Sequence, residues 1–318
     1  MTAPLTNADP VNEPVAGFEA QASMLRAERS QRMRSRFAAS VFVVLWCSGY
    51  PAGKLAVQHG GPFTILFLRF LCGAAIFTAL ALLARAHWPG WRLLGRSAVV
   101  GLLSLALSFA GIYEGLHLGV STGVSALFIG AMPLATALFG IAFGDRLSGR
   151  QWFGLALGFV GVILVLEGRL GDSAGIGLGY LASLIGLIGF SLGTLYQKRH
   201  SSMIDLRVGL AAQHIAAALA LLPLALFADH FRADWSSTYV GAVTWLILVN
   251  SVGGFALLFV LLRRGAATQV AALFYLMPPI TALMGFVVLD EHLSLSMLPG
   301  FVFVAIGVWL GTQRSAVS

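Results

Sequence analysis

An internal repeat restricts the fold of this chain more than any other feature of its sequence. Two apolar stretches, which begin at Thr122 and Thr268, align without a gap at an offset of 146 residues (268 minus 122). The residues that recur at this offset are Thr122, Val124, Ala126, Leu127, Phe128, Pro133, Leu147, Ser148, Gly154, Gly161, Val162 and Leu164. We therefore expect two copies of one structural unit. In a membrane protein, such a repeat is typical of a carrier whose binding site lies between the copies.

The composition places this repeat in a lipid environment. Hydrophobic residues make up 58% of the 318 residues and charged residues only 10%, whereas soluble domains have roughly 45–50% and about 25%. The net charge of +7 comes from residues in short breaks and in one tail, so it favours orientation in a membrane over nucleic-acid binding. Cys47 and Cys72 lie in apolar segments and lack the spacing of a disulfide framework or a metal site.

The apolar segments predict an all-α membrane protein. Residues 1–36 are polar and then rich in arginine, so we expect a disordered cytosolic tail. A helix that crosses the hydrocarbon core needs about 20 residues. Segments of this kind fall at about 37–58, 62–84, 97–117, 121–143, 150–167, 175–197, 207–228, 239–262, 267–289 and 295–312. These ten predicted transmembrane helices divide into two five-helix repeats, at 37–167 and 175–312.

The distribution of basic residues predicts how these helices are oriented. With the tail inside, every break on the inner side carries arginine or lysine, whereas the outer loops carry only Arg169 and Arg232. Cytoplasmic loops are usually the positive ones, so both termini are expected in the cytoplasm. Because each repeat has an odd number of helices, the two repeats enter the membrane in opposite directions, which makes them an inverted repeat.

Four motifs within this framework resemble a known family. They read WCSGYPAGKLA from Trp46, FLRFLCGA from Phe67, MPLATALFGIAFGDRLSGRQWFG from Met132 and MPPITALMGFVVLDEHLS from Met277. In this order, they resemble the EamA-type transporters of the drug/metabolite transporter superfamily. The resemblance implies a carrier in the bacterial inner membrane for small metabolites, often amino acids or their derivatives, with a cavity between the halves. The acidic residue of the repeated motif, usually Glu in the family, is Asp145 in the first copy and Glu291 in the second.

Three ionisable residues lie at membrane depth in the first half: Lys54, Arg69 and Glu114. An ionisable side chain in the hydrocarbon core costs about 2.5 kcal/mol or more, so each is a candidate functional residue. Because successive helices alternate in direction, all three are expected in the outer half of the membrane. Together they would form a cluster with one net positive charge that suits a substrate carboxylate. The alternative is structural: Arg69 pairs with Glu114, and Lys54 extends to the outer interface.

Aromatic and amide side chains supply further candidates for substrate binding, which are Trp46, Tyr50, Tyr113, Asn250 and Tyr275. A mostly apolar cavity with a few polar groups is typical of small-molecule sites. Aromatic residues near helix ends also form interface belts, and an amide such as Asn250 also joins neighbouring helices. The candidates for proton coupling are Glu114 and His214. The alternative for His214 is a neutral histidine that bonds a neighbouring helix.

These observations predict a secondary transporter that exports or exchanges a small zwitterionic or anionic metabolite by alternating access. The sequence contains no Walker loop and no HExxH motif, so we expect no enzyme activity, no cofactor and no metal site. The expected partners are a small-molecule substrate, the lipid bilayer and, as a candidate, a second copy in a homodimer, but no nucleic acid. Two other functions stay open: a membrane sensor or assembly subunit without transport, and an intramembrane enzyme.

Overall fold

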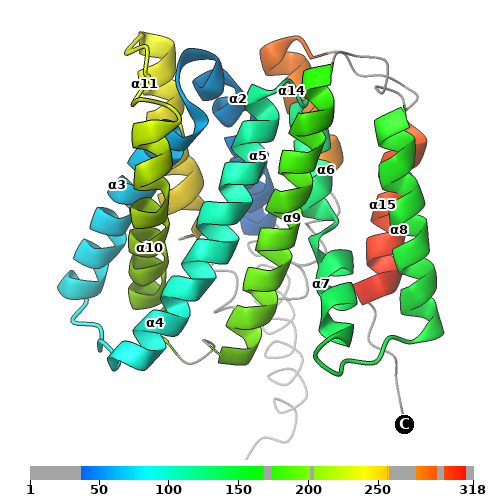
Figure 1. Ribbon diagram of the computed structural model, residues 1–318, viewed down its shortest axis with the longest axis horizontal. Helices are drawn as coiled ribbons and strands as arrows, with labels where there is room; N and C mark the ends of the chain where they lie inside the picture. Colours follow the sequence, from blue (N-terminus) through cyan, green and yellow to red (C-terminus); the bar gives the residue numbers. More distant parts are fainter. Residues whose placement is uncertain are drawn as a thin grey trace, which may run out of the picture.

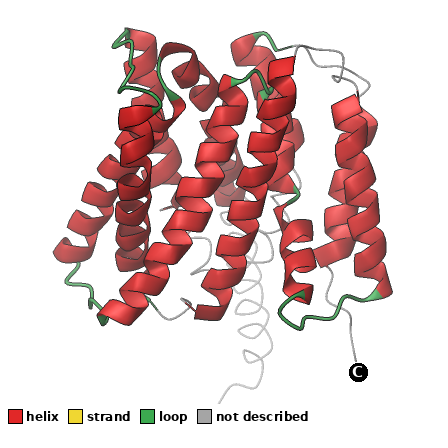
Figure 2. Cartoon of the chain, viewed as in Figure 1, coloured by secondary structure: helices red, strands yellow, loops and turns green. Residues whose placement is uncertain are grey.

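The computed structural model describes residues 37–167, 174–200, 204–255, 257, 277–291 and 297–312, which form helices and no strand (Figure 2). The elements are α2 (Gly49–His59), α3 (Pro62–Leu83), α4 (Trp91–Val100), η1 (Gly101–Leu107), α5 (Ser108–His117), α6 (Thr122–Gly130), α7 (Met132–Ile141), α8 (Gly149–Glu167), α9 (Ala174–His200), α10 (Leu206–Phe227), α11 (Ser237–Thr244), η2 (Trp245–Gly253), α14 (Met277–Leu289) and α15 (Leu298–Thr312) (Figure 1). Helices follow from the long apolar runs, because in lipid only a helix satisfies its backbone hydrogen bonds within one segment.

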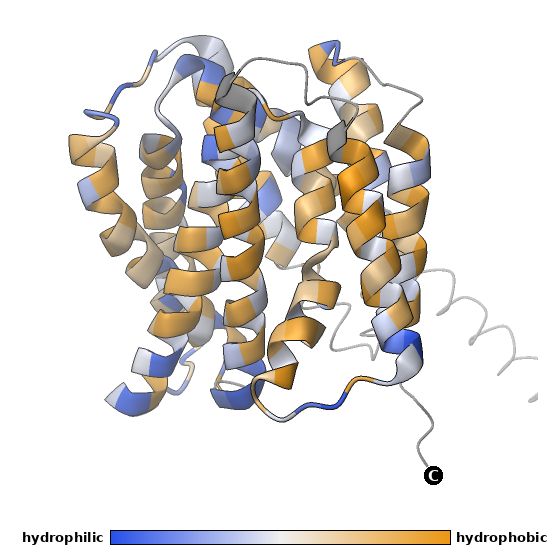
Figure 3. Ribbon diagram, turned by 45° about the vertical axis from the view of Figure 1, so that its right-hand side comes forward, coloured by the Kyte–Doolittle hydropathy of each residue, from blue (hydrophilic) through white to orange (hydrophobic). Residues whose placement is uncertain are grey.

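Among the described residues, six helical stretches are long and apolar enough to cross a membrane: Phe37–His59, Pro62–Leu83, Trp91–His117, Thr122–Ile141, Gly177–His200 and Leu206–Phe227. Four shorter apolar helices, Gly149–Val165, Ser237–Gly253, Met277–Leu289 and Leu298–Gly311, lie where the sequence predicts the other spans. The count of ten membrane helices therefore stays a prediction. Hydrophobic residues cover the middle of the helices, and hydrophilic residues gather toward the two ends (Figure 3). This distribution matches a bundle that is surrounded by lipid.

Helices of the first half pack against helices of the second half in matched pairs. α3 lies along α10, and α8 lies along α15. These two pairs stand at opposite sides of the molecule in Figure 1. Between them, α5 packs on α9 and α6 packs on α14. The main buried core draws on both halves, with residues such as Phe70 and Leu127 from the first and Leu221 and Leu246 from the second.

Glycines hold α8 and α15 in close contact. A Cβ atom on Gly154 would lie 2.6 Å from the Gly307 carbonyl oxygen, and one on Gly161 would lie 2.7 Å from the Gly300 carbonyl oxygen. Larger residues at these positions would push the helices apart, as in other membrane helix pairs built on small residues. Because the later glycine of α8 meets the earlier glycine of α15, the two helices run antiparallel.

Two helices contain π-helical turns at equivalent places in the repeat. η1 interrupts the helix that runs from α4 into α5, and η2 continues α11. The offset of 146 residues carries 101–107 onto 247–253, which lies within η2. π-helical turns are rare and occur frequently at functional sites. Both segments flank the cavity that is described next.

Candidate functional site

Arg69 is the buried charge at the centre of the candidate site. It lies in α3 and is only 3% exposed. Its Nε donates to Ser251 Oγ at 2.9 Å, and its Nη1 donates to the Tyr113 hydroxyl oxygen at 2.9 Å. Its Nη2 donates to Asn250 Oδ1 at 2.5 Å. Arg69 thus joins α3 to α5 of its own half and to η2 of the second half.

No carboxylate neutralises this guanidinium within the described residues, since none of the ion pairs formed there includes Arg69. The ring centroid of Phe109 lies 4.7 Å from Arg69 Cζ, which adds a cation–π contact. Three neutral acceptors leave part of the capacity of a group with five N–H donors unused. The site therefore holds a buried positive charge that an anionic ligand can neutralise.

Backbone contacts fix the acceptor that faces Arg69. Asn250 Nδ2 donates to the carbonyl oxygens of Leu45 at 3.1 Å and Trp46 at 3.0 Å, so its Oδ1 is left for Arg69. Gly49 is required for this approach, because a Cβ atom there would lie 2.5 Å from Asn250 Nδ2. Gly49 and Ser251 are not among the residues that the sequence predicts for the site. A serine or glycine in an apolar segment has no distinguishing pattern, and only the tertiary pairing of the helices reveals its role.

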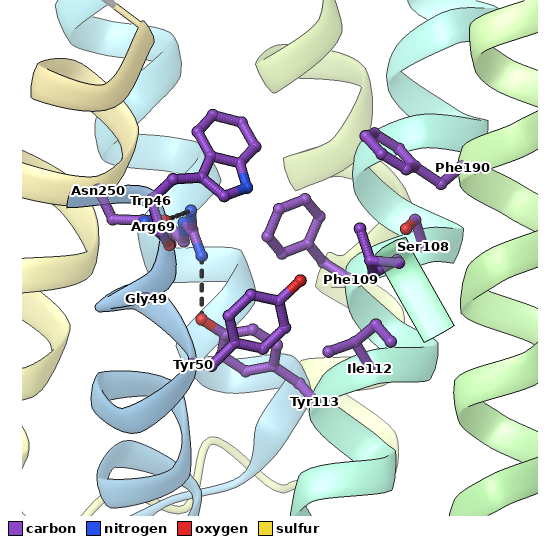
Figure 4. Close-up of a pocket in the computed structure, with 11 residues that line it drawn as sticks. Trp46, Gly49, Tyr50, Arg69, Ser108, Phe109, Ile112, Tyr113, Phe190 and Asn250 are labelled. Carbon is purple, nitrogen blue, oxygen red and sulfur yellow. Dashed lines mark hydrogen bonds between the residues drawn. The ribbon is translucent and has the colours of Figure 1, made fainter. Parts of the chain in front are cut away.

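A cavity opens beside this network, and we call it the Arg69 cavity (Figure 4). Its eleven lining residues are Trp46, Gly49, Tyr50, Arg69, Ser108, Phe109, Ile112, Tyr113, Ile129, Phe190 and Asn250. The volume of the cavity is about 40 Å³. Small-molecule pockets typically measure about 300–1,000 Å³, so the cavity is narrow in this conformation and has to widen before it admits a small metabolite.

The predicted binding residues divide into those that meet at this cavity and those that do not. Trp46, Tyr50, Tyr113 and Asn250 line it together with Arg69. They come from the first, third and eighth predicted helices, and the tertiary packing brings them together. Tyr275, which was also predicted, lies outside the described residues.

Lys54 and Glu114 do not join Arg69, and this corrects the predicted charge cluster. Lys54 Nζ instead donates to the carbonyl oxygens of Leu116 at 2.6 Å and Val120 at 3.1 Å, where it satisfies the C-terminal end of α5. The alternative Arg69–Glu114 pair is not formed either. Successive residues on a helix point about 100° apart. Because Tyr113 faces Arg69, its neighbour Glu114 faces elsewhere.

Glu114 lines a second cavity at the end of the bundle where α3 begins, which we call the loop-end cavity. Its volume open to water-sized molecules is about 540 Å³. Its lining residues are Pro62, Phe63, Glu114, His117, Ala228, Asp229, His230 and Arg232. Asp229 Oδ2 accepts a hydrogen bond from Thr64 N at 2.7 Å and so caps α3. In the part of the chain that the structure describes, no three His, Cys, Asp or Glu side chains are arranged to hold a metal ion.

His214 is buried and lines neither cavity. Its Nδ1 lies 2.8 Å from the Leu210 carbonyl oxygen, one turn earlier in the same helix. Its ring packs against Phe70, Phe77 and Phe255, and its Nε2 has no hydrogen-bond partner among the described residues. This apolar surrounding matches the alternative of a neutral, structural histidine better than a proton carrier.

Comparison with known proteins agrees with this architecture. A model of the EamA-like transporter family matches residues 34–167 and again residues 177–312. The uncharacterised inner membrane transporter YedA of Escherichia coli K12 is 28% identical over 252 residues, which are 79% of this chain and 81% of that protein. A probable amino-acid metabolite efflux pump of the same organism is 25% identical over 284 residues, which are 86% of this chain and 92% of that protein.

The fold is also known from crystallography. A crystal structure described only as that of a protein has a TM-score of 0.60 and 20% sequence identity to this chain. The match covers 88% of this chain and 96% of that one. At this identity, the likeness establishes the fold alone. Together, the family match, the relatives and the apolar helices establish a multi-pass protein of the inner membrane.

Proposed function

Because this chain belongs to the EamA-like transporter family, we propose that it exports or exchanges a small metabolite whose anionic group binds in the Arg69 cavity. One observation carries the proposal: Arg69 is buried, and its three hydrogen-bond acceptors are neutral. Burying a charge without a counter-charge is costly. A substrate carboxylate would supply that counter-charge, and a guanidinium binds it with two parallel hydrogen bonds. The efflux-pump relative is named for amino-acid metabolites, which agrees with a substrate of this kind.

We also propose that the two halves move relative to each other to give alternating access. Arg69 and Tyr113 belong to the first half, whereas Asn250 and Ser251 belong to the second. A movement that separates the halves would break the bonds of Arg69 to Asn250 and Ser251 and would keep the bond to Tyr113. Ligand binding and the relative position of the halves would therefore be coupled, which is what a carrier needs.

The proposed arrangement is an inverted repeat of five helices in each half, at 37–167 and 175–312, with both termini in the cytoplasm. The antiparallel contact of α8 with α15 supports it. The offset of 146 residues makes Gly300 the equivalent of Gly154, and Gly307 the equivalent of Gly161. The contact of Gly154 with Gly307 is therefore equivalent to the contact of Gly161 with Gly300, as a two-fold axis perpendicular to the helices requires. A reporter that is active only outside the membrane should be active in the 229–238 loop and silent after Arg314. Activity after Arg314 would contradict the proposed topology.

Glu114 is the proposed group for coupling transport to protons. Its side chain lines the wide loop-end cavity, where water reaches it. Proton coupling predicts that a pH gradient across a vesicle drives substrate movement in the original protein and does not drive it in Glu114→Gln. If the gradient drives both proteins equally, Glu114 is not the coupling group.

Comparative metabolite profiling tests the proposal directly. Cells with and without the protein should differ in the export of one or more small anions, and those compounds are then tested for counterflow in proteoliposomes.

Arg69→Lys keeps the charge but loses the planar fork, so counterflow should fall with little change in protein level. The matched control is Arg92→Lys, at an exposed arginine beside the Trp91 ring. Equal counterflow by both variants and the original protein would reject Arg69 as the binding group.

A further inference from the structure

We propose that the Arg69 cavity selects small carboxylates that have an apolar body and no ammonium group, and that it discriminates against the corresponding amino acids. This inference rests on the proposed function of the same cavity and goes beyond it by naming the substrate class. Three features of the cavity support it: the donors that face the cavity, the absence of an acidic residue from its lining and the apolar groups that form the rest of its wall.

The polar groups that face the cavity are mainly hydrogen-bond donors. Besides Arg69, the Trp46 indole N–H and the Tyr50 hydroxyl have no hydrogen-bond partner among the described residues. Both side chains line the cavity, and the Tyr50 hydroxyl points toward the side of Phe109 and Ile112 (Figure 4). The Tyr113 hydroxyl accepts from Arg69 and keeps its own hydrogen for a ligand. The strongest acceptor, Asn250 Oδ1, is already bonded to Arg69. A ligand therefore meets a set of donors that matches the two oxygens of a carboxylate.

The charges of the lining residues leave no favourable position for an ammonium group. Arg69 is the one formally charged residue among the eleven lining residues, so the cavity repels a second cation. The two acids of this region, Glu114 and Asp229, line the loop-end cavity instead. The aromatic face of Phe109 already binds a cation, because it stacks with Arg69 at 4.7 Å. An ammonium group would thus lose its hydration without gaining a carboxylate partner.

The remaining wall is apolar except for Ser108 and suits a hydrocarbon body. Ile112 and Phe190 line the cavity away from Asn250 and Arg69, and Ile129 is a further apolar lining residue. Burying an apolar group against such a wall contributes about 25 cal/mol for each Å² that is removed from water. The ligand that satisfies the whole cavity therefore carries one carboxylate at one end and an alkyl or aryl group at the other.

Three ligands that share one apolar body test this inference: 3-phenylpropionate, L-phenylalanine and 2-phenylethylamine. Purified full-length protein is unfolded thermally in detergent at increasing concentrations of each compound, because a ligand that binds the folded state raises the Tm. We expect 3-phenylpropionate to reach half of its effect at a concentration about tenfold lower than L-phenylalanine, since the ammonium group is left without a charged partner. We expect no shift with 2-phenylethylamine. Counterflow in proteoliposomes should rank the compounds in the same order.

Arg69→Met separates the failure of this inference from the failure of the proposed function. If L-phenylalanine binds as tightly as 3-phenylpropionate, and both effects vanish in Arg69→Met, the cavity binds carboxylates but the selection against ammonium is wrong. If no compound shifts the Tm, or if the shifts persist in Arg69→Met, both proposals fail. The control is Arg92→Met, which should leave all three responses unchanged.

Tyr50→Phe is the second variant, in case Arg69→Met does not fold. It removes one donor from the cavity and keeps the ring that packs against the core. Binding of 3-phenylpropionate should weaken about fivefold, because the loss of one neutral hydrogen bond typically has an effect of this size. Unchanged binding would show that the Tyr50 hydroxyl does not contact the carboxylate, and it would overturn the proposed donor set.

Discussion

The Arg69 cavity and the loop-end cavity lie in the same bundle but use charge in different ways. The Arg69 cavity is narrow, is lined by aromatic and aliphatic groups, and contains one cation that is held by three hydrogen bonds. The loop-end cavity is wide and is lined by acids, histidines and an arginine. A charge interacts much more strongly in a dry environment than in a wet one. A single residue therefore dominates the electrostatics of the first cavity, whereas water weakens the interactions of the charges in the second.

The largest expected effect comes from Asn250→Asp, which tests whether the charge of the Arg69 cavity is available to a ligand. The new carboxylate would lie next to Arg69 Nη2, where Oδ1 lies at 2.5 Å, and it would neutralise the guanidinium internally. Binding of an anionic substrate should weaken on the order of 100-fold, as when one partner of a buried charge pair is removed. Counterflow and ligand-induced Tm shifts measure this. An unchanged affinity would mean that the substrate does not use the charge of Arg69.

The next largest effect is an energetic coupling that should be present within the Arg69 cavity and absent between the two cavities. A double-mutant cycle of Arg69→Met with Tyr113→Phe should give a coupling energy of about 1–3 kcal/mol in thermal stability, because the two side chains share a buried hydrogen bond. The same cycle of Arg69→Met with Glu114→Gln should be additive within about 0.5 kcal/mol. Strong coupling to Glu114 would show that the two cavities act as one site.

A smaller effect is expected for Asp229, whose role in the loop-end cavity is to cap a helix. Asp229→Ala should destabilise the protein by about 1 kcal/mol, since the Thr64 N–H loses its acceptor. Asp229→Asn keeps an acceptor and should recover most of that stability. Neither variant should change the ranking of the three phenyl ligands. A changed ranking would assign substrate recognition to the loop-end cavity as well.

The smallest expected effect concerns Asp205, which lies outside both cavities and caps α10. Its hydrogen bonds with Arg207 hold the pKa of this carboxyl below its usual value. Such a group stabilises the folded state above its unfolded pKa of about 3.9, and this stabilisation is lost as the pH falls through the lower folded pKa. At neutral pH, Asp205→Ala should therefore lower the free energy of unfolding by less than about 1 kcal/mol. Its Tm should lie slightly below that of the original protein. The gap should close in strong acid. A gap that stays constant with pH would exclude the ionised cap as its cause.

The sequence predicted those parts of the site that depend on residue type. An arginine, aromatic rings and an amide at membrane depth identify Arg69, Trp46, Tyr50, Tyr113 and Asn250 without any knowledge of contacts, because such groups are costly or unusual in lipid. The repeat at Thr122 and Thr268 likewise indicated two copies of one unit, and the family model matches each half.

The sequence did not predict what depends on direction and register. Glu114 was expected beside Arg69, but its neighbour Tyr113 occupies that side of the helix, and one residue turns the side chain by about 100°. Lys54 was expected in the same cluster, but its Nζ instead donates to carbonyl oxygens in the last turn of α5 and just after it. Ser251 reaches Arg69 because α3 packs beside η2, and this long-range pairing has no signature in the local sequence.

The matching positions of η1 and η2 indicate the order of two events in the evolution of this chain, an insertion and a duplication. A π-helical turn holds one more residue than an α-helical turn, so it arises most simply when one residue is inserted into an existing helix. The turn at 101–107 and its equivalent at 247–253 occupy the same place in the two repeats. Two independent insertions at one position are less economical than a single insertion that was then copied. One insertion before the repeat was duplicated is therefore enough to account for both turns. The earlier helices of the two halves align at an offset of 144 residues, at which Arg69 falls on Gln213, so the two copies differ at this position.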